Sequence, residues 1–159
     1  MKPIYNLQQS RTRGLSVVAG LILMVFCENI KIPFIPISFT LHTFGVALCG
    51  LCLTPKKAFL AITGFLLLKI TTGLNFSGMA VGFYFGFPIA GLVISLLKNR
   101  VPQFGALCIG QLVTYFFGVT WMVPFLGWQT AFVQGAGVFV FTDLIKNGAA
   151  MALTRKARQ

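Results

Sequence analysis

The stretch "VPQFGALCIGQLVTYFFGVTWMVPFLGWQTAFVQGAGVFVFT" (101–142) is the strongest indication of the fold class, because it contains no Asp, Glu, Lys or Arg. It is long enough for two helical spans of a bilayer at about 20 residues each. Residues 32–55 and 70–97 form two further stretches without these four residue types. In the whole chain 57% of residues are hydrophobic and 9% are charged, against about 25% charged residues in a soluble domain. These patterns predict an all-α integral membrane protein with a single domain over residues 1–159.

Proline, glycine and clusters of charge divide the chain into six predicted transmembrane helices. These helices cover about residues 15–29, 39–53, 58–70, 79–97, 104–123 and 131–153. Residues 1–14 and 154–159 are basic ends on either side of this bundle. We expect the second helix to begin near Phe39, with Ser38 as its N-cap.

The distribution of basic residues along the chain tests the predicted number of six helices, because the positive-inside rule places such residues mainly on the cytoplasmic side. If the N-terminus is inside, the inside segments hold ten of the 13 basic residues: Lys2, Arg11, Arg13, Lys56, Lys57, Lys98, Arg100, Arg155, Lys156 and Arg158. The outside segments hold only Lys31 and Lys69. We therefore expect both termini in the cytoplasm. The net charge of +11 does not predict nucleic-acid binding, because the basic residues lie at the ends of apolar segments.

The most unusual polar groups are Asp143 and Lys146, which lie one helical turn apart in the last predicted helix. Each charge at the centre of a spanning helix costs about 2.5–3.5 kcal/mol on insertion scales. The two residues either neutralise each other for packing or mark a path for a substrate, ion or proton, and the second role is typical of ionisable groups in membranes. The only other acidic residue, Glu28, is expected to be a solvated residue at the outer end of the first helix.

Other polar groups gather in the predicted outer connections. The segment "TTGLNFSG" offers Asn75 and Ser77, and "FTLHT" places Thr40, His42 and Thr43 at the outer start of the second helix. The sequence has no nucleophile elbow, no close pair of carboxylates and no phosphate-binding loop. We therefore expect no enzyme, no resident cofactor and no metal site.

Three stretches resemble the BioY family. "IPFIPISFTLHTFGVALCGLCLTPKKAFLAI" (32–62) resembles the family pattern I-P-x-x-P-(V/I)-x-x-T-L-Q-T-x-G-V-x-L-x-G, followed by a proline and a basic pair. "VGFYFGFPIAG" (81–91) is similar to the family's G-G-Y-L-x-G-F segment, and "FTDLIKNGAA" (141–150) to its P-G-D-x-x-K-A stretch. The chain departs from the family at His42, where Gln is usual, at the two residues before the Asp, and in a shortened glycine-rich segment.

The resemblance implies a biotin transporter of the bacterial cytoplasmic membrane. Such proteins are six-helix S components of energy-coupling factor transporters, which capture biotin with high affinity and work with a transmembrane coupling protein and two cytoplasmic ATPases. The resemblance also implies a vitamin site near the outer face, covered by the first and third outer connections. Ser16, Ala19 and Gly20 form a weaker version of the small-residue face that S components present to the coupling protein.

The chemistry of biotin suggests a role for each candidate residue. Asp143 is predicted to accept a hydrogen bond from a ureido N–H, whereas Lys146 has three candidate partners: the ligand carboxylate, the ureido carbonyl or Asp143 itself. The other predicted substrate-binding residues are Thr40, His42, Asn75, Ser77 and Gly78, and the aromatic residues Phe76, Phe83 and Trp121.

Two alternatives remain open from the sequence. One is an S component for a different vitamin. The other is a non-transporting membrane subunit in which Asp143 and Lys146 only stabilise an assembly. The sequence also leaves open whether the chain, surrounded by membrane lipid, is a monomer or a homo-oligomer.

Overall fold

A computed structural model describes the backbone of residues 3–32, 39–74 and 78–156, and the side chains of residues 14–30, 40–74 and 78–156. The predicted site residues Asn75, Phe76 and Ser77 lie outside the described residues, as does the predicted N-cap Ser38.

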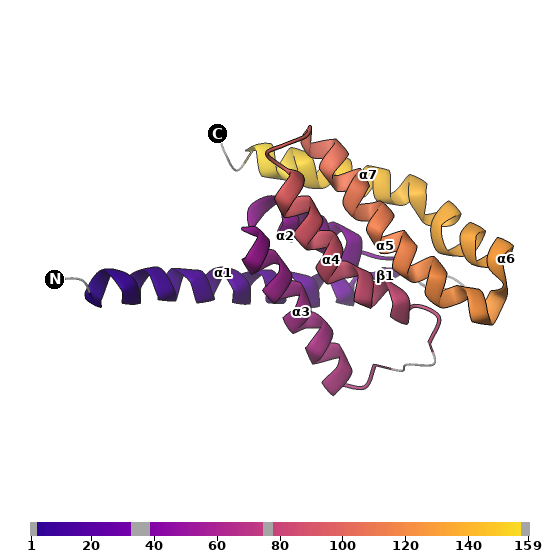
Figure 1. Ribbon diagram of the computed structural model, residues 1–159, viewed down its shortest axis with the longest axis horizontal. Helices are drawn as coiled ribbons and strands as arrows, with labels where there is room; N and C mark the ends of the chain where they lie inside the picture. The colour runs from indigo at the N-terminus through magenta and orange to yellow at the C-terminus, as the bar shows by residue number, and fades with distance from the viewer. Residues whose placement is uncertain (1–2, 33–38, 75–77, 157–159) are drawn as a thin grey trace.

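The described chain forms six helical segments (Figure 1). The first five are α1 (Pro3–Asn29), α2 (His42–Cys52), α3 (Pro55–Thr71), α4 (Val81–Leu97) and α5 (Gln103–Leu126). The sixth is continuous and consists of α6 (Trp128–Phe132), the π-helical turn η1 (Val133–Gly137) and α7 (Val138–Lys156). A short antiparallel pair, β1 (Lys31–Ile32) and β2 (Phe39–Thr40), precedes α2. The prediction of six helices is confirmed.

Several helix boundaries differ from the prediction, and two of these differences have a clear physical reason. α1 begins at Pro3 rather than near residue 15, and the first part of this helix projects beyond the bundle (Figure 1). Hydropathy locates where an apolar segment starts, but polar residues such as Gln and Arg are good helix formers and can extend the helix. α2 begins at His42 rather than near Phe39, because Phe39 and Thr40 pair with β1 instead.

α4 and α5 lie side by side (Figure 1), and they approach each other at glycines. A Cβ atom added to Gly82 would lie 2.3 Å from the Cβ atom of Trp121 and 2.5 Å from the carbonyl oxygen of Phe117. One turn further along α4, a Cβ atom on Gly86 would lie 3.2 Å from the Cα atom of Thr114. The "GFYFG" segment therefore brings the two backbones together, as small residues do between membrane helices.

α1 packs on α3 through the small residues that were expected to face a partner. A Cβ atom on the buried Gly20 would lie 2.9 Å from the Cβ atom of Ala61. The hydroxyl of Ser16 accepts a hydrogen bond from Lys57 Nζ at 3.3 Å. Of the three expected residues only Ala19 is exposed, so most of this small-residue face is used within the chain.

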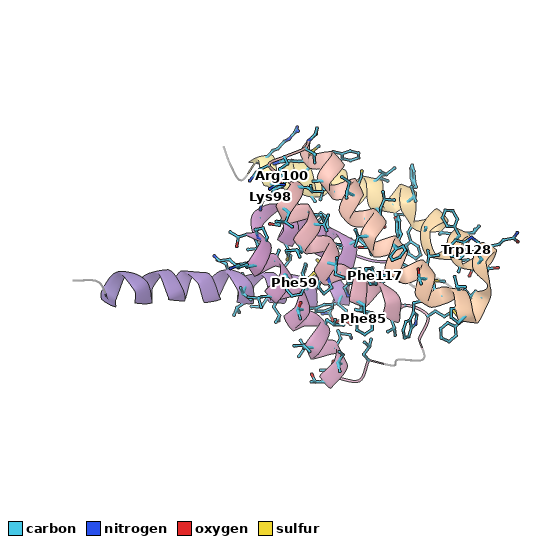
Figure 2. All side chains as sticks on the ribbon, viewed as in Figure 1. Phe59, Phe85, Lys98, Arg100, Phe117 and Trp128 are labelled. Carbon is cyan, nitrogen blue, oxygen red and sulfur yellow. The ribbon has the colours of Figure 1, made fainter. Side chains whose placement is uncertain are left out.

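The two ends of the bundle differ in charge. At one end, Lys98 Nζ donates hydrogen bonds to the carbonyl oxygens of Gly50, Leu51 and Leu53 at the C-terminus of α2. A cation there also interacts favourably with the helix dipole. Figure 2 shows Lys98 and Arg100 at the same end as the last turns of α7, and Trp128 at the opposite end.

Large apolar side chains cover the outside of the bundle. Leu112 and Phe116 of α5 are 65% and 67% exposed, and Phe141 of α7 is 72% exposed. Two helical segments, Gln103–Leu126 and Trp128–Lys156, are long and apolar enough to cross a membrane. Apolar surfaces on this scale suit contact with lipid rather than with water.

Candidate functional site

The carboxylate of Asp143 is the centre of a buried polar cluster. Asp143 is 2% exposed, yet its two oxygens receive hydrogen bonds from four side chains. Oδ1 accepts from Thr43 Oγ1 at 2.7 Å and from Lys146 Nζ at 2.9 Å. Oδ2 accepts from Gln111 Nε2 at 2.9 Å and from the hydroxyl of Tyr115 at 2.7 Å. Buried charges persist only when they are paired and hydrogen-bonded in this way.

Lys146 connects α7 to the start of α2. Besides Asp143, its Nζ atom donates to the carbonyl oxygen of Thr40 at 2.9 Å and to Thr43 Oγ1 at 3.3 Å. An ammonium group has three hydrogens to donate, and three acceptors are in place here. Asp143, one of the three candidate partners for Lys146, is thus in hydrogen-bond contact with it; the other two candidates are groups of the ligand.

Helical spacing explains why these side chains meet. Phe139, Asp143 and Lys146 share one face of α7, because residues three and four apart are neighbours on a helix. Gln111 and Tyr115 lie one turn apart on α5 in the same way. The π-helical turn before α7 also brings α7 close to α5, because Gly135 in this turn has no side chain. A Cβ atom at Gly135 would lie 3.0 Å from Met122 Sδ and 3.1 Å from Val119 Cγ2, both on α5.

The polar cluster forms part of the wall of a cavity of about 330 Å³. This volume lies at the lower end of the range of about 300–1,000 Å³ that is usual for small-molecule pockets. The lining residues come from the start of α2, the start of α4, and from α5 and α7: Thr40, His42, Thr43, Gly78, Met79, Ala80, Phe83, Tyr84, Phe87, Gln111, Tyr115, Phe139, Asp143 and Lys146. The lining therefore combines a charged, polar cluster with aromatic side chains.

His42 links the polar and aromatic parts of this cavity. It is 3% exposed, and its Nδ1 atom lies 2.7 Å from Thr40 Oγ1. The imidazole ring packs against the rings of Phe65 and Tyr84, with centroids 5.4 Å away in both cases, and against Phe87 at 5.6 Å. A ring held on several sides can present a defined edge to a ligand.

Six of the predicted site residues line this cavity: Thr40, His42, Gly78, Phe83, Asp143 and Lys146. Trp121 does not line it. Instead, Trp121 Nε1 donates a hydrogen bond to the carbonyl oxygen of Gly78 at 3.2 Å, and its side chain packs against Gly82. Trp121 therefore supports the edge of the cavity from outside.

Sequence reasoning missed Gln111 and Tyr115, although both contact Asp143. A signal was present for Gln111, because an amide inside an otherwise apolar helix needs a buried partner. Glu28 was also misjudged: its carboxylate forms an ion pair with Lys69 that ties the end of α1 to the end of α3, and its side chain is only 14% exposed.

A bundle of six helical segments with an apolar exterior and an internal polar cavity defines a class: an all-α membrane protein with a site for a small ligand. The family model described as the BioY family matches residues 5–159. The chain belongs to the BioY family, which confirms the resemblance, and the predicted all-α membrane fold is confirmed with it.

Curated relatives and one solved structure support this assignment. The probable biotin transporter BioY of Pyrococcus horikoshii is 31% identical, over 80% of this chain and 85% of the relative. The probable biotin transporter BioY of Bacillus subtilis is 31% identical over 84% of this chain and 82% of the relative, and that of Rickettsia prowazekii is 28% identical over 82% and 75%. The crystal structure of the S component for biotin from an ECF-type ABC transporter matches with a TM-score of 0.76 and 21% identity, covering 99% of this chain and 94% of the other. At that identity the likeness shows a shared S-component fold.

Proposed function

We propose that this chain is the substrate-capturing S component of a biotin uptake system. One observation carries the proposal: the only two charged residues that line the described cavity, Asp143 and Lys146, share its lining with several aromatic side chains. Biotin has a polar ureido ring and an apolar thioether body, so its two parts match the polar and the aromatic components of this lining. The names of the relatives point to the same ligand.

Each side chain has a role in this proposal. Asp143 accepts a hydrogen bond from a ureido N–H, and Lys146 neutralises that carboxylate. Thr40 and His42 line the polar side, while Phe83 covers the apolar body. Asn75, Phe76 and Ser77 are proposed to contribute to binding together with Gly78, which lines the cavity. Trp121 acts indirectly, because its indole N–H holds the carbonyl group of Gly78.

In this proposal, partner proteins supply the energy for uptake. The sequence has no phosphate-binding loop, so the chain would capture biotin by itself and release it inside only with a transmembrane coupling protein and two cytoplasmic ATPases. The proposed location is the bacterial cytoplasmic membrane, with several passes and both termini in the cytoplasm.

One experiment separates capture from transport. The protein, purified in detergent, should retain labelled biotin without any partner. Asp143→Asn should lower the affinity at least about tenfold, because a charge-assisted hydrogen bond contributes about 1.5–3 kcal/mol. In cells, labelled biotin should accumulate only when the genes of the coupling module are present.

The control variant is Cys52→Ser, at an exposed position remote from the cavity, which should bind biotin as the wild type does. Binding of another vitamin in preference to biotin would favour an S component of different specificity. A folded protein that binds no small molecule, and whose host tolerates Asp143→Leu with Lys146→Met, would favour the assembly-subunit alternative.

A further inference from the structure

All positions at which the Asp143 carboxylate can accept a hydrogen bond are already occupied in this structure. A carboxylate offers about four lone-pair positions, and Thr43, Lys146, Gln111 and Tyr115 occupy four of them. A ligand N–H can therefore reach this carboxylate only by replacing a donor. Which donor leaves determines what else the ligand must offer.

The two donors on Oδ1 are held most firmly. Lys146 carries the charge that compensates Asp143, and its Nζ atom also holds the carbonyl oxygen of Thr40. The hydroxyl of Thr43 donates to Asp143 and accepts from Lys146. Loss of either would break two or more hydrogen bonds and leave a buried charge poorly compensated.

The two donors on Oδ2 are different. Gln111 and Tyr115 both come from α5 and both line the cavity. Each is neutral, so its departure from Oδ2 leaves the ion pair intact. An amide or phenol released from Asp143 then needs a new acceptor, because a buried donor without one is costly.

We propose that Gln111 and Tyr115 determine specificity through an exchange of hydrogen bonds, an inference that rests on the proposed function. A ureido N–H replaces one of them on Asp143 Oδ2, and the released donor binds the neighbouring ureido carbonyl oxygen. After this exchange Asp143 Oδ2 still accepts two hydrogen bonds, and the released donor still has an acceptor. The site therefore selects ligands in which an N–H donor and a C=O acceptor are adjacent, as in a cyclic urea.

An analogue of biotin with sulfur in place of the ureido oxygen tests this exchange. Its N–H groups still serve Asp143, but its thiocarbonyl group is a weak acceptor. Competition against labelled biotin gives the ratio of the two dissociation constants, analogue over biotin. For the wild type we expect a ratio of about five to ten, the range of one neutral hydrogen bond.

Tyr115→Phe and Gln111→Met each remove one donor without changing the size of the side chain greatly. At least one of these variants should bring the ratio to about two or less. Tyr84→Phe is the matched control, because it removes a phenol hydroxyl from the lining of the same cavity at a residue that the exchange does not use; its ratio should equal that of the wild type. Desthiobiotin, which keeps the ureido ring, should show no change in relative affinity in any variant.

The outcomes are distinct. A wild-type protein that does not bind biotin refutes the proposed function. A wild type that binds biotin, with the same ratio in Tyr115→Phe and Gln111→Met, refutes only the exchange and leaves these residues as positioning residues for Asp143. If one variant does not fold, as judged by gel filtration in detergent, Leu replaces the residue at that position and the ratio of this new variant is measured instead.

Discussion

Asp143 and Lys146 illustrate how a membrane protein keeps charge in its interior. Removing two ions from water is costly, and their attraction offsets this cost only when further hydrogen bonds satisfy both groups. Here Thr43, Gln111 and Tyr115 donate those bonds to the carboxylate, and the Thr40 carbonyl group accepts one from the ammonium. The pair is therefore a preorganised part of the cavity wall.

We predict that Lys146→Met destabilises the protein more than the double variant Asp143→Leu with Lys146→Met. The single change leaves a buried carboxylate without its cation, a loss of about 3–5 kcal/mol for a broken buried pair. The double change removes the charge as well, so part of this loss should be recovered. The measurement is thermal unfolding of the four members of the cycle in detergent.

Asp143→Leu alone completes this cycle, and biotin binding is recorded in parallel. The double variant should be folded yet unable to bind. If Lys146→Met unfolds at the wild-type temperature, the two charges are not coupled energetically, and the contact of 2.9 Å contributes little.

The residue scale also shows what a sequence reveals about a site. Asp143 and Lys146 were found because charges are rare in apolar helices. Tyr115 was not, because a tyrosine in such a helix is equally consistent with packing or with an interfacial position. Its role depends on α5 facing α7, and the spacing of residues within one helix does not define which helix it faces.

At the scale of helices, the interface of α4 and α5 positions much of the cavity. Met79, Ala80, Phe83 and Tyr84 lie at or near the start of α4, and Gln111 and Tyr115 belong to α5. Glycines set the distance between the two helices, so a change in this distance should alter both stability and the cavity.

We predict that Gly82→Ala destabilises the protein by about 1–3 kcal/mol, the usual cost of overpacking. The new methyl group would lie 2.5 Å from the backbone oxygen of Phe117, which can move only if α5 moves. Biotin affinity should fall too, because Trp121 holds Gly78 at the edge of the cavity. Unfolding temperature and biotin affinity in detergent measure both effects.

Gly105→Ala is the matched control on α5. A Cβ atom at Gly105 would meet nothing within 4 Å, and Ala favours a helix over Gly by about 1 kcal/mol. This variant should be as stable as the wild type or slightly more stable. Equal losses in both variants would contradict a role for close packing at Gly82.

Helix number and type could be predicted from the sequence, whereas the ends of the helices could not. Uncharged stretches separated by prolines and basic residues define how many segments cross a membrane. They do not show that α1 continues through polar residues to Pro3, nor that Phe39 and Thr40 form a strand pair instead of the first turn of α2. Backbone hydrogen bonds determine where these two helices begin, and a hydropathy pattern contains no information about those bonds.

For the whole molecule, the cavity and the basic cluster of Lys98, Arg155 and Lys156 lie at opposite ends of the bundle. His42 and Thr43 at the start of α2 line the cavity, whereas the end of α2 binds Lys98. α4 likewise runs from the cavity to Lys98, and α7 runs from Asp143 to Arg155 and Lys156. The positive-inside rule predicts that the basic end is cytoplasmic, so we expect the cavity to face the outside, where a vitamin must be captured.

We predict that reporters attached to the chain will show this orientation. Green fluorescent protein fused to the C-terminus should fluoresce, and alkaline phosphatase at the same position should be inactive, because the phosphatase needs the oxidising exterior. A phosphatase fusion after Leu74, between α3 and α4, should give the opposite result and serves as the matched control. An active phosphatase at the C-terminus would place the cavity on the cytoplasmic side, and capture of external biotin at this cavity would then be wrong even if the purified protein binds the vitamin.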